Sequence, residues 1–145
     1  MEQGLIMERT LAILKPTATE RKIIGTIVGI IEGKGLKIVA LKMIWLSKEM
    51  AETFYKEHRR KPFFEKLVKH ITSLPIVIIV AEGKNAIKGL RQICGVTDSM
   101  EAAPGSIRGK FGLDVTENTI HASDSPESAE REIELFFKEE EIYAY

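Results

Sequence analysis

The feature that most constrains the fold is an unbroken apolar run, "IVIIVA", at residues 76–81. Its β-branched residues favour an extended strand. Because no residue of the run is polar, we predict a central strand that is buried on both faces of a sheet. The run is the longest apolar stretch of the chain and is far too short to span a bilayer, so no membrane segment is expected.

Strand and helix patterns alternate on either side of this run. Further strands are predicted at residues 9–15, where Pro16 stops the strand, at residues 36–46, and around His121. Residues 96–117 show no regular period, and a loop of that length is typical of functional or interface segments. Helices are predicted within residues 21–35, 47–60, 63–71 and 85–95, and after Ser125 as cap with Pro126 at the first position. The pattern fits a parallel α/β sheet and a four-stranded ferredoxin-like α+β sandwich about equally well.

The length of 145 residues, with 44% hydrophobic and 29% charged residues, is typical of one globular domain. We assign that domain to residues 7–145 and treat residues 1–6 as a short extension, since Met7 could be an internal start. The first residues resemble neither a signal peptide nor a transit peptide. Because Cys94 is the one cysteine, no internal disulfide can form, and a reducing, cytoplasmic location is expected.

The chain carries 21 basic and 21 acidic residues, so it has no overall positive field that would favour nucleic acid. The charges are nevertheless separated along the chain. Residues 56–70 hold six Lys or Arg against two acids, whereas residues 124–145 hold eight acids against two Lys or Arg. This asymmetry favours the binding of a small anion on one face.

The stretch "NTIHASDSPESAEREI", residues 118–133, sets a histidine among small and polar residues. In an extended strand, His121 shares one face with Thr119 and Ser123, while their apolar neighbours share the other face. A histidine between two hydroxyl residues on a polar face is a candidate for chemistry. The sequence alone leaves a structural role about as plausible.

The helix after His121 supplies a candidate partner. Glu132 lies at the margin of its apolar stripe, where a carboxylate is costly unless it has a partner, and the imidazole could be that partner. A carboxylate bonded to one ring nitrogen would fix the tautomer and leave the other nitrogen as a nucleophile. The alternative is a solvated Glu132 on an acid-rich helix. The stripe consists of Ala129, Ile133, Phe136 and Phe137.

Phosphate-binding loops are poorly represented in the sequence. "GIIEGKG" and "GSIRGKF" are each one residue short of a Walker loop and are interpreted as turns. Phosphates would therefore be held mainly by side chains, which directs attention to Lys15, Arg91 and Arg108. No metal-ligand spacing is visible, so a divalent ion is expected to arrive with a phosphate-bearing ligand. His58 is interpreted as a solvated residue of a basic turn and His70 as a helix-face residue.

Several motifs resemble those of nucleoside diphosphate kinases, in the order and spacing of that family. "NTIHASDS" is similar to the family signature around its histidine, and the other similar blocks are "ERTLAILKP", "RKPFFEKLV", "PGSIRG" and "SDSPESAEREIELFF". The resemblance begins at Met7 and runs almost to the end of the chain. It implies the ferredoxin-like sandwich with a four-stranded antiparallel sheet.

The resemblance implies a ping-pong phosphotransferase that passes the γ-phosphate of a nucleoside triphosphate, typically ATP, to a nucleoside diphosphate. His121 would carry the phosphate on Nδ1, with Glu132 orienting the ring and Ser123 supporting that contact. The metal, Mg²⁺, would be held through the nucleotide phosphates and not by protein side chains. The implied nucleotide-binding residues are Lys15, Tyr55, Arg91, Thr97 and Arg108 at the phosphates, Asn118 at the sugar, and Phe63 with Leu67 at the base.

The resemblance also implies a homo-oligomer, a hexamer or alternatively a tetramer. Ser99 and Lys110 depart from the family pattern and leave the assembly open. The alternative function is a non-catalytic ferredoxin-like module that senses nucleotides or binds RNA through residues 58–61. Such a module would need neither His121 nor its acidic partner. For the kinase, removal of Arg108 is expected to lower turnover by orders of magnitude at similar fold stability.

Overall fold

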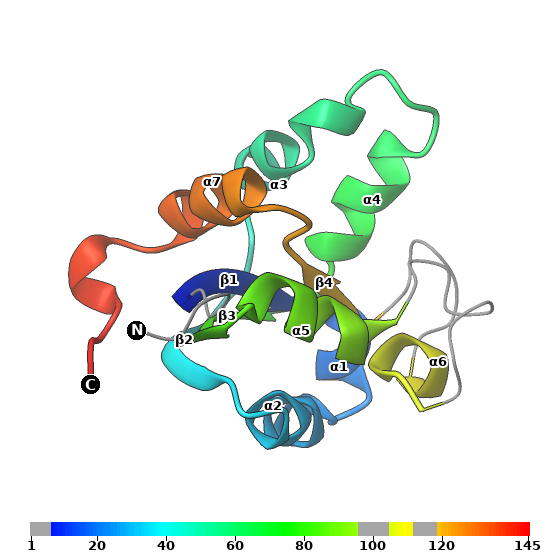
Figure 1. Cartoon of the computed structure of the whole chain (residues 1–145). Coiled ribbons are helices and arrows are strands. Elements are labelled where there is room, and N and C mark those ends of the chain that lie inside the picture. Colours follow the sequence, from blue (N-terminus) through cyan, green and yellow to red (C-terminus); the bar gives the residue numbers. More distant parts are fainter. Residues whose placement is uncertain (1–6, 96–104, 112–118) are drawn as a thin grey trace.

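The computed structural model describes residues 7–95, 105–111 and 119–145. In this part of the chain the strands are β1 (Met7–Leu14), β2 (Lys37–Ile44), β3 (Ile76–Lys84) and β4 (Ile120–Ala122). They form a four-stranded sheet in the order β2-β3-β1-β4, and each neighbouring pair is antiparallel (Figure 1). The prediction of a ferredoxin-like α+β sandwich is therefore confirmed, and the parallel alternative is wrong.

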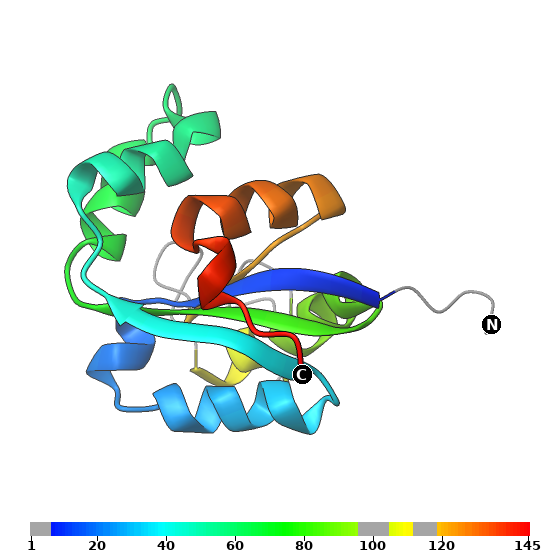
Figure 2. The same ribbon diagram turned by 90° about the vertical axis from the view of Figure 1, so that its left-hand side faces the viewer.

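Helices cover both faces of the sheet, so that the sheet is the middle of three layers (Figures 1 and 2). One face carries α1 (Pro16–Glu20), α2 (Ile24–Gly33), α5 (Ala86–Cys94) and α6 (Ile107–Phe111). The other face carries α3 (Lys48–Phe54), α4 (Phe64–Ile71) and α7 (Pro126–Phe136), with the short 3₁₀ helices η1 (Lys56–His58) and η2 (Glu139–Glu141). None of the helices in the described ranges is long and apolar enough to cross a membrane.

Strand β3 lies between these layers, with β2 on one side and β1 on the other. Its apolar residues are at most 3% exposed, and they alternate between two hydrophobic clusters. The cluster beneath α3, α4 and α7 contains Ile76, Ile78 and Val80, and the cluster on the opposite face contains Val77, Ile79 and Ala81. The predicted central strand, buried on both faces, is confirmed.

Three short helical elements differ from the sequence prediction. Helix α1 begins directly at Pro16, where the strand was expected to stop, because the fixed φ of proline also suits the first position of a helix. Helix α6 lies inside the stretch without a regular period, and η2 lies near the C-terminus. Each has five residues or fewer, too few for an apolar helical period to become visible.

Candidate active site

Strand β4 presents His121 on one face of the sheet. Strand β4 lies at the edge of the sheet, and its residue His121 is paired with Ile13 of β1. Ile120 and Ala122 are buried in the cluster beneath α5, so the alternation of the strand turns the imidazole toward α3 and α7. The ring of Phe54, at the end of α3, meets the imidazole edge to face, with the ring centroids 5.0 Å apart. An apolar wall therefore limits the movement of the imidazole.

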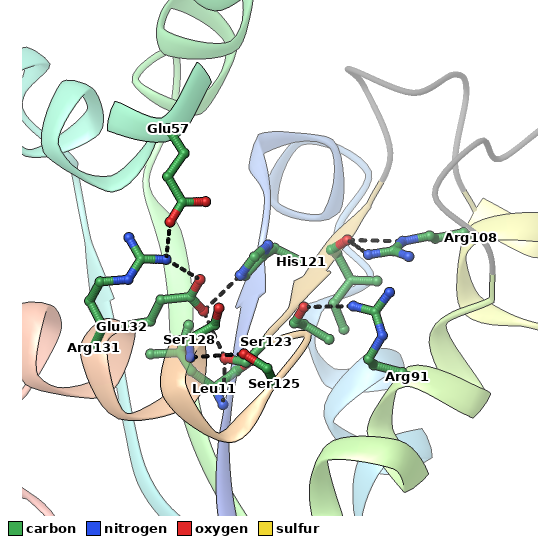
Figure 3. Close-up of polar contacts among 12 residues, drawn as sticks. Leu11, Glu57, Arg91, Arg108, His121, Ser123, Ser125, Ser128, Arg131 and Glu132 are labelled. Atoms are coloured by element: carbon green, nitrogen blue, oxygen red, sulfur yellow. Dashed lines mark hydrogen bonds and ion pairs between the residues drawn. The ribbon is translucent and has the colours of Figure 1, made fainter. Parts of the chain in front are cut away.

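Helix α7 brings an acid to the same ring. Ser125 caps the helix by accepting a hydrogen bond from the backbone N–H of Ser128 at 3.1 Å, and Pro126 stands at the helix start. Beginning so soon after β4, the helix lies back across the sheet, where Glu132 approaches His121 (Figure 3). Oε1 of the carboxylate is 2.9 Å from Nε2 of the imidazole, and the Glu132 side chain is 7% exposed.

Ser123 binds the same carboxylate oxygen. Its hydroxyl donates to Oε1 of Glu132 at 2.7 Å and accepts from the backbone N–H of Leu11 at 3.4 Å. An ionised carboxylate only accepts hydrogen bonds, so the ring nitrogen that faces it, Nε2 of His121, carries a proton. In a neutral imidazole, Nδ1 then has the available lone pair. The arrangement leaves a nucleophilic nitrogen on the part of the ring that does not contact the acid.

Two arginines bind backbone carbonyls of β4 (Figure 3). Arg91, on α5, donates from Nη1 to the carbonyl of Ala122 at 3.2 Å. Arg108, on α6, donates from Nε and Nη2 to the carbonyl of Ile120, at 3.2 and 3.0 Å, and from Nη1 to the carbonyl of Gly95 at 2.8 Å. These bonds satisfy carbonyls at the sheet edge and hold two positive charges beside the strand that carries the histidine.

The two arginines differ in burial, and a thiol lies near them. Arg108 is 5% exposed, whereas Arg91 is exposed. Burial lowers the pKa of the Arg108 guanidinium, an effect that Cys94 opposes and the charge of Arg91 increases. Burial also raises the pKa of the Cys94 thiol to about 11, although both arginines act in the opposite direction. The thiol is therefore neutral at ordinary pH and does not cancel the positive charge.

Lys15 is a third cation near β4 and is 6% exposed. Its backbone N–H donates to the carbonyl of Thr119 at 2.9 Å, which places the residue beside the start of the strand. Arg91 and Arg108 thus bind β4, and Lys15 lies beside its start, from three separate parts of the chain. In the described ranges, no three acids, histidines or cysteines gather as metal ligands. These residues fit an anion, and a divalent ion would have to be held by the oxygens of that anion.

The segment from α3 to α4 carries Phe63 and Leu67, which are predicted at the base, and Tyr55, which is predicted at the phosphates. Tyr55 and Leu67 are each 8% exposed and pack in the hydrophobic core, whereas Phe63 is 40% exposed. Burial, followed by the negative charge of Glu132, raises the pKa of the Tyr55 hydroxyl, which stays protonated. Phe63 therefore offers an accessible ring, whereas Tyr55 and Leu67 are packed in the core.

His58 is not the freely solvated residue that the sequence suggests. Its ring centroid lies 5.6 Å from that of Phe63 and 6.3 Å from that of Tyr55. Its Nδ1 is buried and has no hydrogen-bond partner among the residues described. Burial, helped by Lys61 and opposed by Glu57, lowers the pKa of the imidazole. The solvation prediction is wrong because the chain folds this ring against two aromatic side chains.

Three residues named in the sequence analysis, Thr97, Ser99 and Asn118, lie outside the described residues.

The structure also shows an ion pair that the sequence analysis overlooks. In it, Nη2 of Arg131 is 3.3 Å from Oε1 of Glu57 and 3.9 Å from Oε2 of the neighbouring Glu132. The one sequence feature that could have indicated this pair is that Arg131 directly precedes Glu132.

Comparison with known proteins points to one family. The family model described as nucleoside diphosphate kinase matches residues 8–142. The nucleoside diphosphate kinase of Archaeoglobus fulgidus is 60% identical over 136 residues, which cover 94% of this chain and 90% of that protein. The enzyme of the same description from Pyrococcus furiosus is 56% identical over 142 residues, which cover 96% of this chain and 88% of that protein.

Solved structures agree with the sequence matches. The nucleoside diphosphate kinase of Aquifex aeolicus matches with a TM-score of 0.93 and 49% identity, covering 95% of this chain and all 100% of the other. The halophilic nucleoside diphosphate kinase of Halobacterium salinarum, solved in complex with CDP, matches with a TM-score of 0.94 and 44% identity. That match covers 97% of this chain and 93% of the other.

Proposed function

Since this chain belongs to the nucleoside diphosphate kinase family of phosphotransferases, we propose that it transfers the γ-phosphate of a nucleoside triphosphate to a nucleoside diphosphate through a phosphohistidine at His121. The observation that carries the proposal is the 2.9 Å contact between Nε2 of His121 and Oε1 of Glu132. This contact occupies one ring nitrogen and leaves Nδ1 for the phosphorus. Because the carboxylate is buried, water competes little for it.

In the first half-reaction, the lone pair of Nδ1 attacks the γ-phosphorus, and the bond from that phosphorus to the bridging oxygen breaks. The nucleoside diphosphate leaves with the bonding electrons. The proton on Nε2 stays in place, so the phosphorylated ring becomes a cation that faces the negative Glu132. In the second half-reaction, an oxygen of another nucleoside diphosphate takes the phosphate and restores the neutral ring. Glu132 thus stabilises a charge that appears only during transfer.

Lys15, Arg91 and Arg108 would hold the phosphates of the nucleotide. Phosphoryl transfer spreads negative charge over the oxygens of the transferred group, and fixed cations stabilise that charge. Arg108 already uses three N–H groups on backbone carbonyls, and its other N–H groups can meet a phosphate. Mg²⁺ would enter with the nucleotide, bound to phosphate oxygens, as part of the substrate. Thr97 joins this set on the family resemblance alone.

Phe63 would stack on the base of the nucleotide. A phenyl ring is indifferent to base identity, because each base has a π-face, so a broad range of nucleotides is expected. The Halobacterium salinarum relative was solved in complex with CDP, and we infer that nucleoside diphosphates of this kind also bind here. Leu67 would lie beside Phe63 at the base, the protonated Tyr55 hydroxyl would face the phosphates, and Asn118 would meet the sugar.

A homo-oligomer, hexameric or alternatively tetrameric, is supported by the surface of β2. This strand lies at the edge of the sheet, and the C-terminal segment bonds to its first half, where the N–H of Tyr143 donates to the carbonyl of Val39 at 2.9 Å. Farther along, Leu41 and Met43 of β2 and Trp45 directly after it are 52%, 55% and 64% exposed. Large exposed apolar side chains on an edge strand favour pairing with another chain. The mass of the particle in solution tests this proposal, and a monomer would exclude it.

A labelling experiment tests the chemistry. The protein is mixed with γ-labelled ATP and Mg²⁺ and examined for a phosphoprotein that is labile in acid and stable in alkali. We expect the label on the wild type, no label on His121→Ala, and unchanged labelling on the control His70→Gln. Label that persists on His121→Ala would overturn the assignment of the nucleophile. An unlabelled wild type would favour the non-catalytic nucleotide-sensing module.

A further inference from the structure

The carboxylate of Glu132 presents an electrostatic problem before any phosphate is transferred. Its side chain is 7% exposed, and the ring that it contacts must be neutral to act as a nucleophile. A buried negative charge without a nearby cation is destabilising. Ser123 and His121 supply hydrogen bonds to Oε1 but no positive charge in this state. The second oxygen, Oε2, therefore determines how well the acid is stabilised.

Arg131 supplies a positive charge at that second oxygen. Its Nη2 is 3.9 Å from Oε2 of Glu132 and 3.3 Å from Oε1 of Glu57. Figure 3 shows the resulting row, in which Glu57 on η1 faces Arg131 on α7, and Glu132 lies between Arg131 and His121. Glu57 belongs to the segment between α3 and α4 that also carries Phe63. The row thus connects the predicted nucleotide-binding segment to the histidine.

We propose that Arg131 is a positioning residue for the phosphohistidine reaction, and that Glu57 sets the place of Arg131. The charge of Arg131, 3.9 Å from the outer oxygen Oε2 of Glu132, attracts that oxygen, so that the inner oxygen Oε1 stays directed at Nε2 of His121. Through Glu57, the same guanidinium ties α7 to the α3–α4 segment. The inference rests on the proposed function, because it concerns the acid that orients the proposed nucleophile.

The geometry determines which substitutions discriminate. A single atom, Nη2, makes both contacts. The ammonium of a lysine can therefore supply the same positive charge at this place, whereas an uncharged methionine cannot. The Arg131 side chain is 34% exposed, and solvent screening limits the effect. A loss of about fivefold in rate is expected, which corresponds to the upper range for a partly exposed ion pair.

The experiment measures single-turnover phosphorylation of His121 by ATP with Mg²⁺ over a range of ATP concentrations. Arg131→Met should lower the maximal rate about fivefold while changing the half-saturating ATP concentration less than about twofold. Arg131→Lys should recover most of the rate. Glu57→Gln should give a smaller loss, and the double variant should be no slower than Arg131→Met alone, because the two residues act in one row.

Arg9→Met is the matched control. Arg9 is 41% exposed and forms a shorter ion pair, 2.9 Å from Glu82, at a site four residues along β1 from the partner of His121. Its removal should leave the rate unchanged. If Arg131→Met fails to fold, Glu57→Gln still tests the inference, because the Glu57 side chain is 67% exposed and its substitution should not affect folding.

Each outcome separates this inference from the function on which it rests. A wild type that acquires no label would refute the proposed function itself. A labelled wild type with Arg131→Met equally fast would refute the role of Arg131 alone. Arg131→Lys as slow as Arg131→Met, or Arg9→Met as slow as either, would also refute it, since the charge at that place would then carry no specific effect.

Discussion

The two sides of His121 are built differently. On the side of Nε2, Glu132 and Ser123 bind through side chains that are themselves buried. On the side of α5 and α6, Arg91 and Arg108 bind the strand through the backbone carbonyls of residues next to the histidine. The first side fixes the orientation of the imidazole ring. The second side fixes the position of the strand and leaves part of each guanidinium for a ligand.

This difference shows how one short strand can serve two purposes. Side-chain contacts fix the orientation and the tautomer of the imidazole, and they depend on the identity of each partner. The backbone contacts do not depend on the side chains at Ile120 and Ala122, which remain apolar and fill the core on the opposite face. The charged groups are therefore brought to the strand without placing a polar side chain in the core beneath it.

The largest effect is expected for Arg108→Ala, which removes the most buried group of the arginine side. Turnover should fall by about 10²–10³-fold, because one fixed cation is lost at the transferred phosphate. Stability should also fall, by about 1–3 kcal/mol, because the carbonyls of Ile120 and Gly95 lose their donor. The expectation of unchanged stability, made from the sequence, is replaced by this one. Steady-state kinetics and urea unfolding measure the two changes.

Arg91→Ala is the comparison for that variant. Arg91 is exposed and makes one bond to the carbonyl of Ala122, so its removal should lower turnover with little change in the free energy of unfolding. Equal loss of stability in the two variants would contradict the distinction between a buried and an exposed arginine.

A second test uses the reactivity of the Cys94 thiol to measure how well the region beside the two arginines is buried. With a pKa of about 11, about 0.1% of this thiol is ionised at pH 8, against about 10% for a thiol with a pKa near 9. Because Cys94 is both protonated and fully buried, a thiol reagent should react at least about 100-fold more slowly with the native protein than with the unfolded chain at pH 8. Because the acid form loses its proton as pH rises, the native rate should increase about tenfold per pH unit up to pH 10.

The chain has one cysteine, so a reagent that releases a coloured thiolate when it reacts with a thiol measures the reaction of Cys94 alone. A native rate close to that of the unfolded chain would show that the thiol is accessible and ionised, contrary to its burial beneath the arginines. The arginine side would then hold less net positive charge than its geometry indicates.

Much of the fold was accessible from the sequence because its signals are local. The apolar run of β3 and the cap and proline before α7 depend on residues that lie close together in the chain. The placement of Glu132 at the margin of an apolar stripe is likewise a local signal, since it depends on the residues of one helix. The direction of the strands was not accessible from pattern, because parallel and antiparallel arrangements require the same alternation of strands and helices.

The contacts that escaped prediction join parts of the chain that are far apart in sequence. Arg108 meets Gly95 and Ile120, and Arg131 meets Glu57, in pairings that no periodicity records. His58 was misjudged for a different reason: its neighbours Tyr55 and Phe63 are close in sequence, but only the fold of η1 brings the three rings together. Charge alone could not show that an exposed-looking turn places an imidazole against aromatic side chains.

On the side of the buried acid, Ser123→Ala is expected to have a smaller effect than Arg108→Ala. The variant removes one of the two hydrogen bonds at Oε1 of Glu132 and leaves the other, to His121. Turnover should fall about three- to tenfold, because the ring keeps its partner but the partner is held less firmly. Stability should fall by about 1 kcal/mol.

Ser125→Ala is matched to it in stability, since loss of the cap of α7 also costs about 1 kcal/mol, but it leaves the contacts of Glu132 intact. If Ser123→Ala lowers turnover no more than Ser125→Ala, the loss follows from a weakened α7, and the Ser123 hydroxyl has no separate part in orienting the acid. A larger loss in Ser123→Ala, at equal unfolding free energy, would show that Oε1 must be held from two directions for the ring to be aligned.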